Sequence, residues 1–188
     1  MKKICFFLVT VILLQPALAQ TDTFDIMRFT PPKEFKKENK PGGVVFSQAN
    51  DSTGFFCAII IFASTSGSGD AMKDFKSQWA ELAVKKHNAD PNPETEKAKT
   101  ADGWQMITGA SIFKINEKGA YIILTLFSGF GKRVSVIFTL NDNSYLAKLD
   151  DFLESVRFNK SKSIPKKPVP KKINATPGTK ANKGAGKS

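Results

Sequence analysis

The segment from Phe55 to Ala63 constrains the fold most, because every residue in it is apolar. A strand with one solvated face alternates apolar and polar side chains, whereas this segment has no polar face. Turn-forming residues precede it at Asn50 to Gly54, and a Ser- and Gly-rich stretch follows it. The segment therefore predicts a central strand in a sheet that is covered on both sides.

Two segments have the apolar period of a helix that lies on a sheet. The first runs from the N-cap residue Asp70 to about His87. The second follows Asn141 and runs to about Val156. Apolar residues recur in steps of three and four in both segments, at Met72, Phe75, Trp79, Leu82 and Ala83 in the first and at Tyr145, Leu149, Phe152, Leu153 and Val156 in the second. This spacing predicts two amphipathic helices.

The remaining apolar segments are typical of strands. We expect one strand over Thr23–Thr30, a short one from Gly43 to about Gln48, and four in series at about 94–100, 104–115, 120–128 and 132–141. Short connections that contain glycine favour antiparallel hairpins. The sequence thus predicts a single α+β domain over residues 20–158, with a mostly antiparallel twisted sheet of about six to seven strands and two main helices packed on it.

The N-terminus has the pattern of an export signal. Lys2 and Lys3 precede an apolar run from Ile4 to Leu14, and the small residues Ala17 and Ala19 follow it. The run is shorter than the ~20 residues that span a bilayer. We therefore predict a signal peptide over residues 1–19 and an exported bacterial protein, periplasmic or secreted, without a transmembrane segment after cleavage.

The net charge of +11 is concentrated at the end of the chain. The stretch 159–188 has nine lysines, no acidic residue and no aromatic residue, while residues 20–158 carry equal numbers of basic and acidic residues. Such a Lys-, Pro- and Gly-rich composition predicts a disordered basic tail. The tail is either a plain solvating segment or an arm that adheres to an anionic polymer or lipid, with candidate contacts at Lys160, Lys162, Lys166, Lys167, Lys171 and Lys172. Export makes nucleic acid an improbable physiological ligand.

The chemistry of residues 20–158 is sparse. His87 is the sole histidine, and we expect it to be exposed at a helix end. Cys57 lies among apolar residues and is expected to be a small buried hydrophobe. The acidic pairs Asp150/Asp151 and Glu94/Glu96 are expected to be exposed solubilising groups. We therefore predict no catalytic residues, no metal site and no cofactor.

Two further features leave alternatives open. The Gly67-Ser-Gly69 stretch before the first helix could form an anion-binding loop, but Asp70 would repel an anion and suits a helix cap better. Trp104 and Tyr121 could line a pocket between sheet and helix, or could serve as core and cross-strand residues.

The order of elements resembles the PsbP-like superfamily, which includes the extrinsic photosystem II subunit, a Ran-binding nuclear import factor and many bacterial envelope proteins. The resemblance covers about residues 23–158, with a Pro-rich turn at Pro31-Pro32-Lys33-Glu34-Phe35 and a closing Ser155-Val156-Arg157-Phe158. It implies a sheet layered between helices, an α/β/α sandwich, and a protein that binds partners. No family site motif is present, so no binding residue is transferred. Envelope relatives are often lipoproteins, whereas Gln20 stands here at the predicted cleavage point.

The sequence therefore predicts a non-catalytic, monomeric binding or accessory protein of the cell envelope, whose partner is an envelope protein or an anionic surface. The first alternative is a small-ligand carrier or an unrecognised hydrolase with a cavity near Trp104 and Tyr121. The second is a protein inhibitor, which an exposed apolar patch would indicate.

Overall fold

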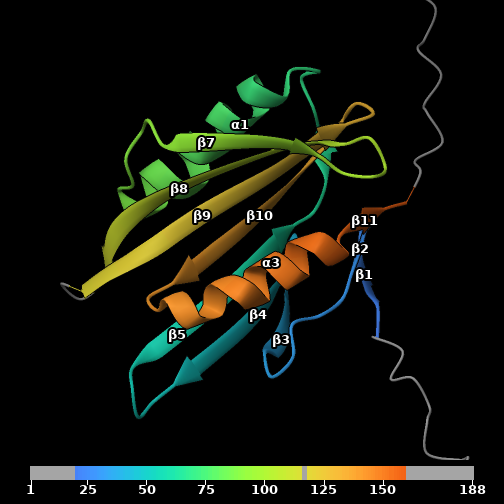
Figure 1. Cartoon of the computed structure of the whole chain (residues 1–188). Helices are drawn as coiled ribbons and strands as arrows, with labels where there is room; N and C mark the ends of the chain where they lie inside the picture. The colour runs from blue at the N-terminus through green and yellow to red at the C-terminus, as the bar shows by residue number, and fades with distance from the viewer. Residues whose placement is uncertain (1–19, 116–117, 160–188) are drawn as a thin grey trace, which may run out of the picture.

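The computed structural model describes residues 20–115 and 118–159 (Figure 1). The predicted signal peptide and the six candidate tail lysines lie outside these residues. The strands are β1 Asp22–Phe24, β2 Met27–Phe29, β3 Lys36–Lys40, β4 Gly43–Asn50, β5 Phe55–Phe62, β6 Thr65–Ser66, β7 Glu94–Lys99, β8 Gln105–Ile115, β9 Lys118–Gly129, β10 Lys132–Leu140 and β11 Arg157–Phe158. The helices are α1 Ala71–Trp79, which continues through a π-helical turn at Ala80–Val84 into α2 Lys85–His87, and α3 Leu146–Ser155, which follows a 3-10 turn at Asn143–Tyr145.

The main sheet has the strand order β3-β4-β5-β10-β9-β8-β7, and all of its pairings are antiparallel. The two-residue strand β6 pairs with the start of β10, on the side where β5 pairs with the rest of it. The predicted α+β class and the mostly antiparallel sheet are confirmed.

The prediction of a central strand covered on both faces is confirmed for β5. It lies between β4 and β10. Cys57, Ile59 and Ile61 are buried in the core beneath α3, whereas Phe56 and Ile60 pack against the core beneath α1. Successive side chains of a strand point to opposite faces, so an all-apolar strand needs both cores.

The helices lie on opposite faces of the sheet (Figure 1). Phe152 of α3 packs with Phe138 of β10, with ring centroids 6.0 Å apart. Phe75 of α1 belongs to the other core, with Leu124 of β9 and Ile137 of β10. We call these two sides of the sheet the α3 face and the α1 face. Both helices form where the apolar period predicted them, and each buries its apolar stripe.

The prediction of a single strand over Thr23–Thr30 is wrong. The backbone of Asp25 has a φ of +52°, and the chain reverses there into the β1–β2 hairpin. β11 pairs with β2 to complete a separate three-stranded sheet. The Asp25 carboxylate accepts a hydrogen bond from the Ser64 N–H (2.6 Å), so a residue distant in sequence supports this turn. Short aspartate side chains tolerate the left-handed region better than most.

Strand β3 was not expected from the sequence. Its segment, Lys36 to Lys40, is entirely polar and fully exposed. It pairs with β4, at one edge of the main sheet as the described residues form it. A polar edge strand has no apolar alternation to mark it, and its charges protect the edge from other strands.

Candidate functional site

The candidate site is a groove between α1 and the edge strand β7. One part, of about 480 Å³, is lined by Met72, Phe75, Lys76, Trp79, Ala80, Val84, Pro91, Asn92, Pro93 and Thr95. An adjoining hollow of about 450 Å³ shares Met72 and continues along β7 past Lys97 and Lys99, with Asp70, Ala98, Gln105, Met106 and Ile107. We call the two parts together the α1–β7 groove.

The floor of this groove is aromatic. Phe75 and Trp79 are buried and stack one helical turn apart, with ring centroids 5.9 Å apart. Phe75 lies directly over Gly109 of β8, where a Cβ atom would come within 2.6 Å of the ring. Gly109 therefore allows α1 to approach the sheet closely, since any side chain there would push Phe75 away.

The end of the groove near the loop from Asp90 to Pro93 is held by hydrogen bonds. The Trp79 indole N–H donates to the Asp90 carbonyl (2.7 Å). The Asp90 N–H donates in turn to the Ser111 hydroxyl of β8 (3.1 Å). The π-helical turn Ala80–Val84, which contributes Ala80 and Val84 to the groove, follows Trp79 directly. Single π-helical turns within helices are found frequently at functional sites.

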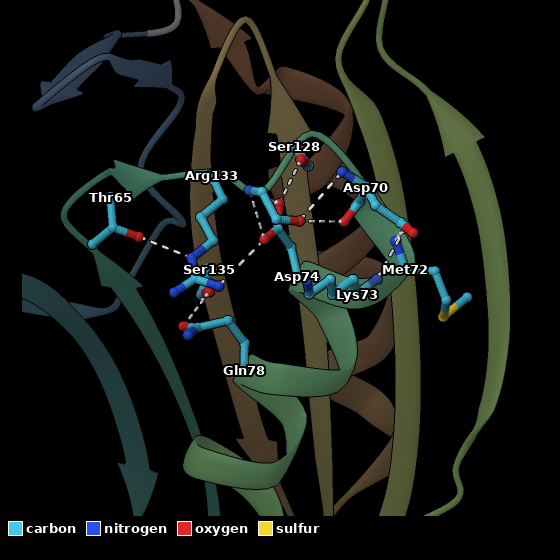
Figure 2. A network of polar contacts seen from close by, with 10 residues as sticks. Thr65, Asp70, Met72, Lys73, Asp74, Gln78, Ser128, Arg133 and Ser135 are labelled. Atoms are coloured by element: carbon cyan, nitrogen blue, oxygen red, sulfur yellow. Dashed lines mark hydrogen bonds and ion pairs between the residues drawn. The ribbon is translucent and has the colours of Figure 1, made fainter. Parts of the chain in front are cut away.

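A buried carboxylate holds the start of α1 in place (Figure 2). Asp74 is only 2% exposed. It accepts hydrogen bonds from the Ser68 N–H (3.0 Å) and the Ser128 hydroxyl (3.0 Å), and it forms an ion pair with Arg133 (3.4 Å). Asp74 therefore connects the loop before α1 to strands β9 and β10.

This network decides how the Gly67-Ser-Gly69 loop is used. The Ser68 N–H, which could have faced a bound anion, points to the Asp74 carboxylate. Asp70 caps the helix by accepting from the N–H groups of Met72 (2.9 Å) and Lys73 (3.1 Å). The carboxylates of Asp74 and Asp70 thus accept the hydrogen bonds from the backbone N–H groups that an external anion would use here.

The two candidate pocket residues, Trp104 and Tyr121, lie near opposite ends of β9. Trp104 is 2% exposed and stacks on Phe158, with ring centroids 4.2 Å apart. It lies against Gly129, at one end of β9. Tyr121 is 39% exposed and stands eight residues earlier on the same strand, about 26 Å away at 3.3 Å per residue. The structure therefore does not bring Trp104 and Tyr121 into one site.

Tyr121 has a different setting. It lines a hollow of about 360 Å³ together with Ile112 and the residues at the start of the 3-10 turn. Ile112 lies directly opposite Tyr121 in the β8–β9 pairing and is 65% exposed. This cross-strand pair forms a small exposed apolar patch on the α3 face of the sheet.

The reactive side chains behave mostly as the sequence suggested. Burial raises the pKa of the Cys57 thiol to about 12, so this thiol is not a nucleophile at neutral pH. His87 is half-buried rather than exposed, because its ring packs edge-on against Phe113 (5.0 Å). Burial, with a smaller effect of Lys86, lowers the pKa of His87.

The acidic pairs Glu94/Glu96 and Asp150/Asp151 are exposed on β7 and α3, as expected. Over residues 20–115 and 118–159, no group of three or more His, Cys, Asp or Glu side chains is arranged to hold a metal ion. Within the same part of the chain, no helix is long and apolar enough to cross a membrane.

The groove itself was not predicted as a site. Its floor residues Phe75 and Trp79 have the helical spacing of a core stripe, and the sequence assigned them to the core. The groove depends on the position of α1 over β8 and β9, and helical spacing does not contain that information.

Comparisons of the chain with known proteins found one kind of similarity, to solved structures. No family model matches the chain, and no curated protein matches it. Among solved structures, the chain is similar to a crystal structure of a Bacteroides thetaiotaomicron VPI-5482 protein, at 12% identity and a TM-score of 0.47. The match covers 71% of this chain and 45% of that one, so the chain spans less than half the length of this structure.

Proposed function

We propose that this protein is a non-catalytic, exported binding protein of the bacterial envelope, which holds a partner in the α1–β7 groove. The observation that carries the proposal is the groove itself, which combines a buried aromatic floor with a solvent-exposed rim. The Asp74 network and the bond from Trp79 to Asp90 support the two ends of α1, so the groove walls are preorganised. Preorganisation lowers the entropic cost of binding.

The shape of the groove favours a partner segment over a small ligand. Pockets for small molecules bury about 70–90% of the ligand surface. Here Ala80, Pro91 and Thr95 on the rim are all exposed. A compact ligand would remain largely in water, whereas an extended segment could follow the groove along β7. The small-ligand carrier is therefore the second candidate, favoured only by the volume of about 480 Å³.

Site-specific photo-crosslinking tests the groove as the partner site. A benzophenone amino acid placed at Ala80, which lines the groove, should give a discrete crosslinked protein adduct in the native host. The same group at Ser77, which is exposed on the same helix but does not line the groove, is the matched control and should give none. Equal adducts from both positions, or no adduct from Ala80, would contradict the proposal. A crosslink to a small molecule at Ala80 would favour the carrier instead.

We further propose that the basic stretch 159–188 adheres to an anionic surface. The support is its nine lysines without an acidic residue. Each Lys near an anionic lipid surface contributes about 1 kcal/mol, and salt screens this attraction. Deletion of residues 160–188 should abolish retention on phosphatidylglycerol vesicles at low salt, while the intact chain should be released by high salt. Retention that is the same with and without the tail would contradict this role.

A further inference from the structure

We propose that the occupant of the α1–β7 groove is an acidic, extended peptide segment of a partner protein, which adds to the main sheet as a strand antiparallel to β7. This inference rests on the proposed function and specifies its partner. Three features carry it: an open row of backbone groups on β7, the position of the aromatic floor beside that row, and the charge of the side chains around it.

The hydrogen-bond register identifies the open backbone groups of β7. The Thr100 N–H donates to the Trp104 carbonyl (2.9 Å), so these two residues form a hydrogen-bonded pair at the end of the β7–β8 ladder. Hydrogen-bonded pairs occur at every second residue of an antiparallel ladder. Counting back from Thr100, Ala98 and Glu96 are therefore the residues whose backbone groups bond to β8. The backbone groups of Lys97 and its alternate neighbours therefore face outward. Among residues 20–115 and 118–159, β7 is the last strand of the sheet and no other strand pairs with these groups, so they are open to an added strand.

Thr95, Lys97 and Lys99, whose backbone groups face outward, direct their side chains to the α1 face. Lys97 lies opposite Ile107, which belongs to the core beneath α1, and residues directly opposite share a face. An added strand would thus place every second side chain on the α1 face as well. The side chain opposite Thr95 would enter the apolar part of the groove, over Phe75 and Trp79. Peptide capture between a helix and an edge strand uses this combination of backbone pairing and alternate side-chain pockets.

The charges around the groove select the chemistry of the partner. Lys97 and Lys99 point from β7 to the α1 face, and Lys76 of α1 lines the groove. Within the described part of the chain, none of these three lysines forms an ion pair. Glu94 and Glu96 project from β7 to the opposite face. The lining holds these three lysines and one carboxylate, Asp70, so the groove has a net positive charge. Acidic side chains opposite Lys97 and Lys99 would complement it.

The same charges argue against two other occupants. Pairing of β7 with β7 of a second copy, centred on Lys97, would set two Lys97 side chains opposite each other, and like charges in that position are destabilising. The basic stretch 159–188 would meet the same repulsion, since it has no acidic residue. A partner segment with acidic residues at alternate positions and one apolar residue fits both parts of the groove.

Residue-resolved hydrogen exchange on the full chain tests strand addition. The probe is the capped heptapeptide Thr-Glu-Thr-Glu-Thr-Leu-Thr, whose antiparallel register places Glu opposite Lys99 and Lys97 and Leu opposite Thr95. At a peptide concentration about ten times its Kd, exchange of the Lys97 and Lys99 amides should slow about tenfold. The amides of Glu96 and Ala98, which bond to β8 in both states, serve as internal controls and should not change.

A charge exchange tests the selectivity. The control peptide carries Lys in place of both Glu residues. The wild-type protein should bind the Glu peptide at least about tenfold more tightly than the Lys peptide, and the double variant Lys97→Glu/Lys99→Glu should reverse this order. Both positions are exposed, and unchanged exchange of the Glu96 and Ala98 amides will show that β7 of the variant still pairs with β8.

Several results would overturn the inference, and they can be told apart from failure of the proposed function. Unchanged exchange of the Lys97 amide at saturating peptide, or equal affinity for the two peptides, rules out acidic strand addition. If the Ala80 crosslink still forms in that case, the groove remains a partner site used in another way. Slow exchange of the Lys97 amide without peptide, together with a dimer in sedimentation, would identify a second copy as the occupant.

Discussion

Replacement of Asp74 by alanine is expected to lower the free energy of unfolding by about 2–4 kcal/mol. The substitution leaves the Ser68 N–H and the buried Ser128 hydroxyl without their acceptor, and it removes the ion-pair partner of Arg133. A buried donor that has lost its acceptor keeps the free-energy cost of its removal from water, and no hydrogen bond offsets that cost. Arg133 is partly exposed, so water will offset part of its loss. Urea denaturation followed by circular dichroism measures the change.

Asp70→Ala is the matched control, because it removes a carboxylate from the same loop. The Asp70 side chain is exposed and its hydrogen bonds are those of the α1 cap, so the expected loss of stability is about 1 kcal/mol. The same two variants also bear on the groove. Asp74→Ala should weaken peptide binding as well, because the start of α1 loses its connection to β9 and β10. If Asp74→Ala costs no more than Asp70→Ala, the network does not hold α1 in place.

Trp104→Ala is expected to lower the free energy of unfolding by about 3–5 kcal/mol. Trp104 is buried, stacks on Phe158 and lies edge-on to Phe130 (5.8 Å). Phe158 belongs to β11, so this stack joins the small sheet to the main one. A second link is the bond from the Phe158 N–H to the Asp102 carboxylate (2.9 Å). Loss of the indole would leave a cavity at the junction of the two sheets.

Tyr121→Ala is the comparison, since both aromatic residues were candidates for one pocket in the sequence analysis. Tyr121 is 39% exposed, and its truncation should cost about 1 kcal/mol or less. A double-mutant cycle of Trp104→Ala with Phe158→Ala should show a coupling energy of about 0.5–3 kcal/mol, as expected for residues in direct contact. Equal losses for Trp104→Ala and Tyr121→Ala, or additive effects in the cycle, would contradict this assignment. Thermal and urea unfolding both provide the measurement.

The parts of the fold that the sequence predicted share one property, which is a local apolar period. The all-apolar segment of β5 required cover on both faces, and the spacing from Met72 to Ala83 required a helix on a sheet. The parts that it missed lack this signal. Strand β3 is entirely polar, and the β1–β2 turn depends on the contact of Asp25 with Ser64, which lies 39 residues away.

The candidate site divides in the same way. Alternation along residues 94–99 places Lys97 and Lys99 on one face of their strand, and the helical period places Phe75 and Trp79 on one face of their helix. No local pattern in the sequence predicts that these two faces meet at an open edge of the sheet. That meeting depends on the strand order, which leaves β7 last, and on Gly109, which lets Phe75 approach the sheet.

The sequence by itself determined the α+β class, the two amphipathic helices and the concentration of positive charge in the stretch 159–188, because each follows from the order and spacing of neighbouring residues. Only the tertiary structure decided that Trp104 is a core residue, that the Asp74 carboxylate accepts the hydrogen bonds of the loop before α1, and that a groove remains between α1 and β7. These features arise where residues distant in sequence pack together, and their positions are set by the sheet topology and by close contacts.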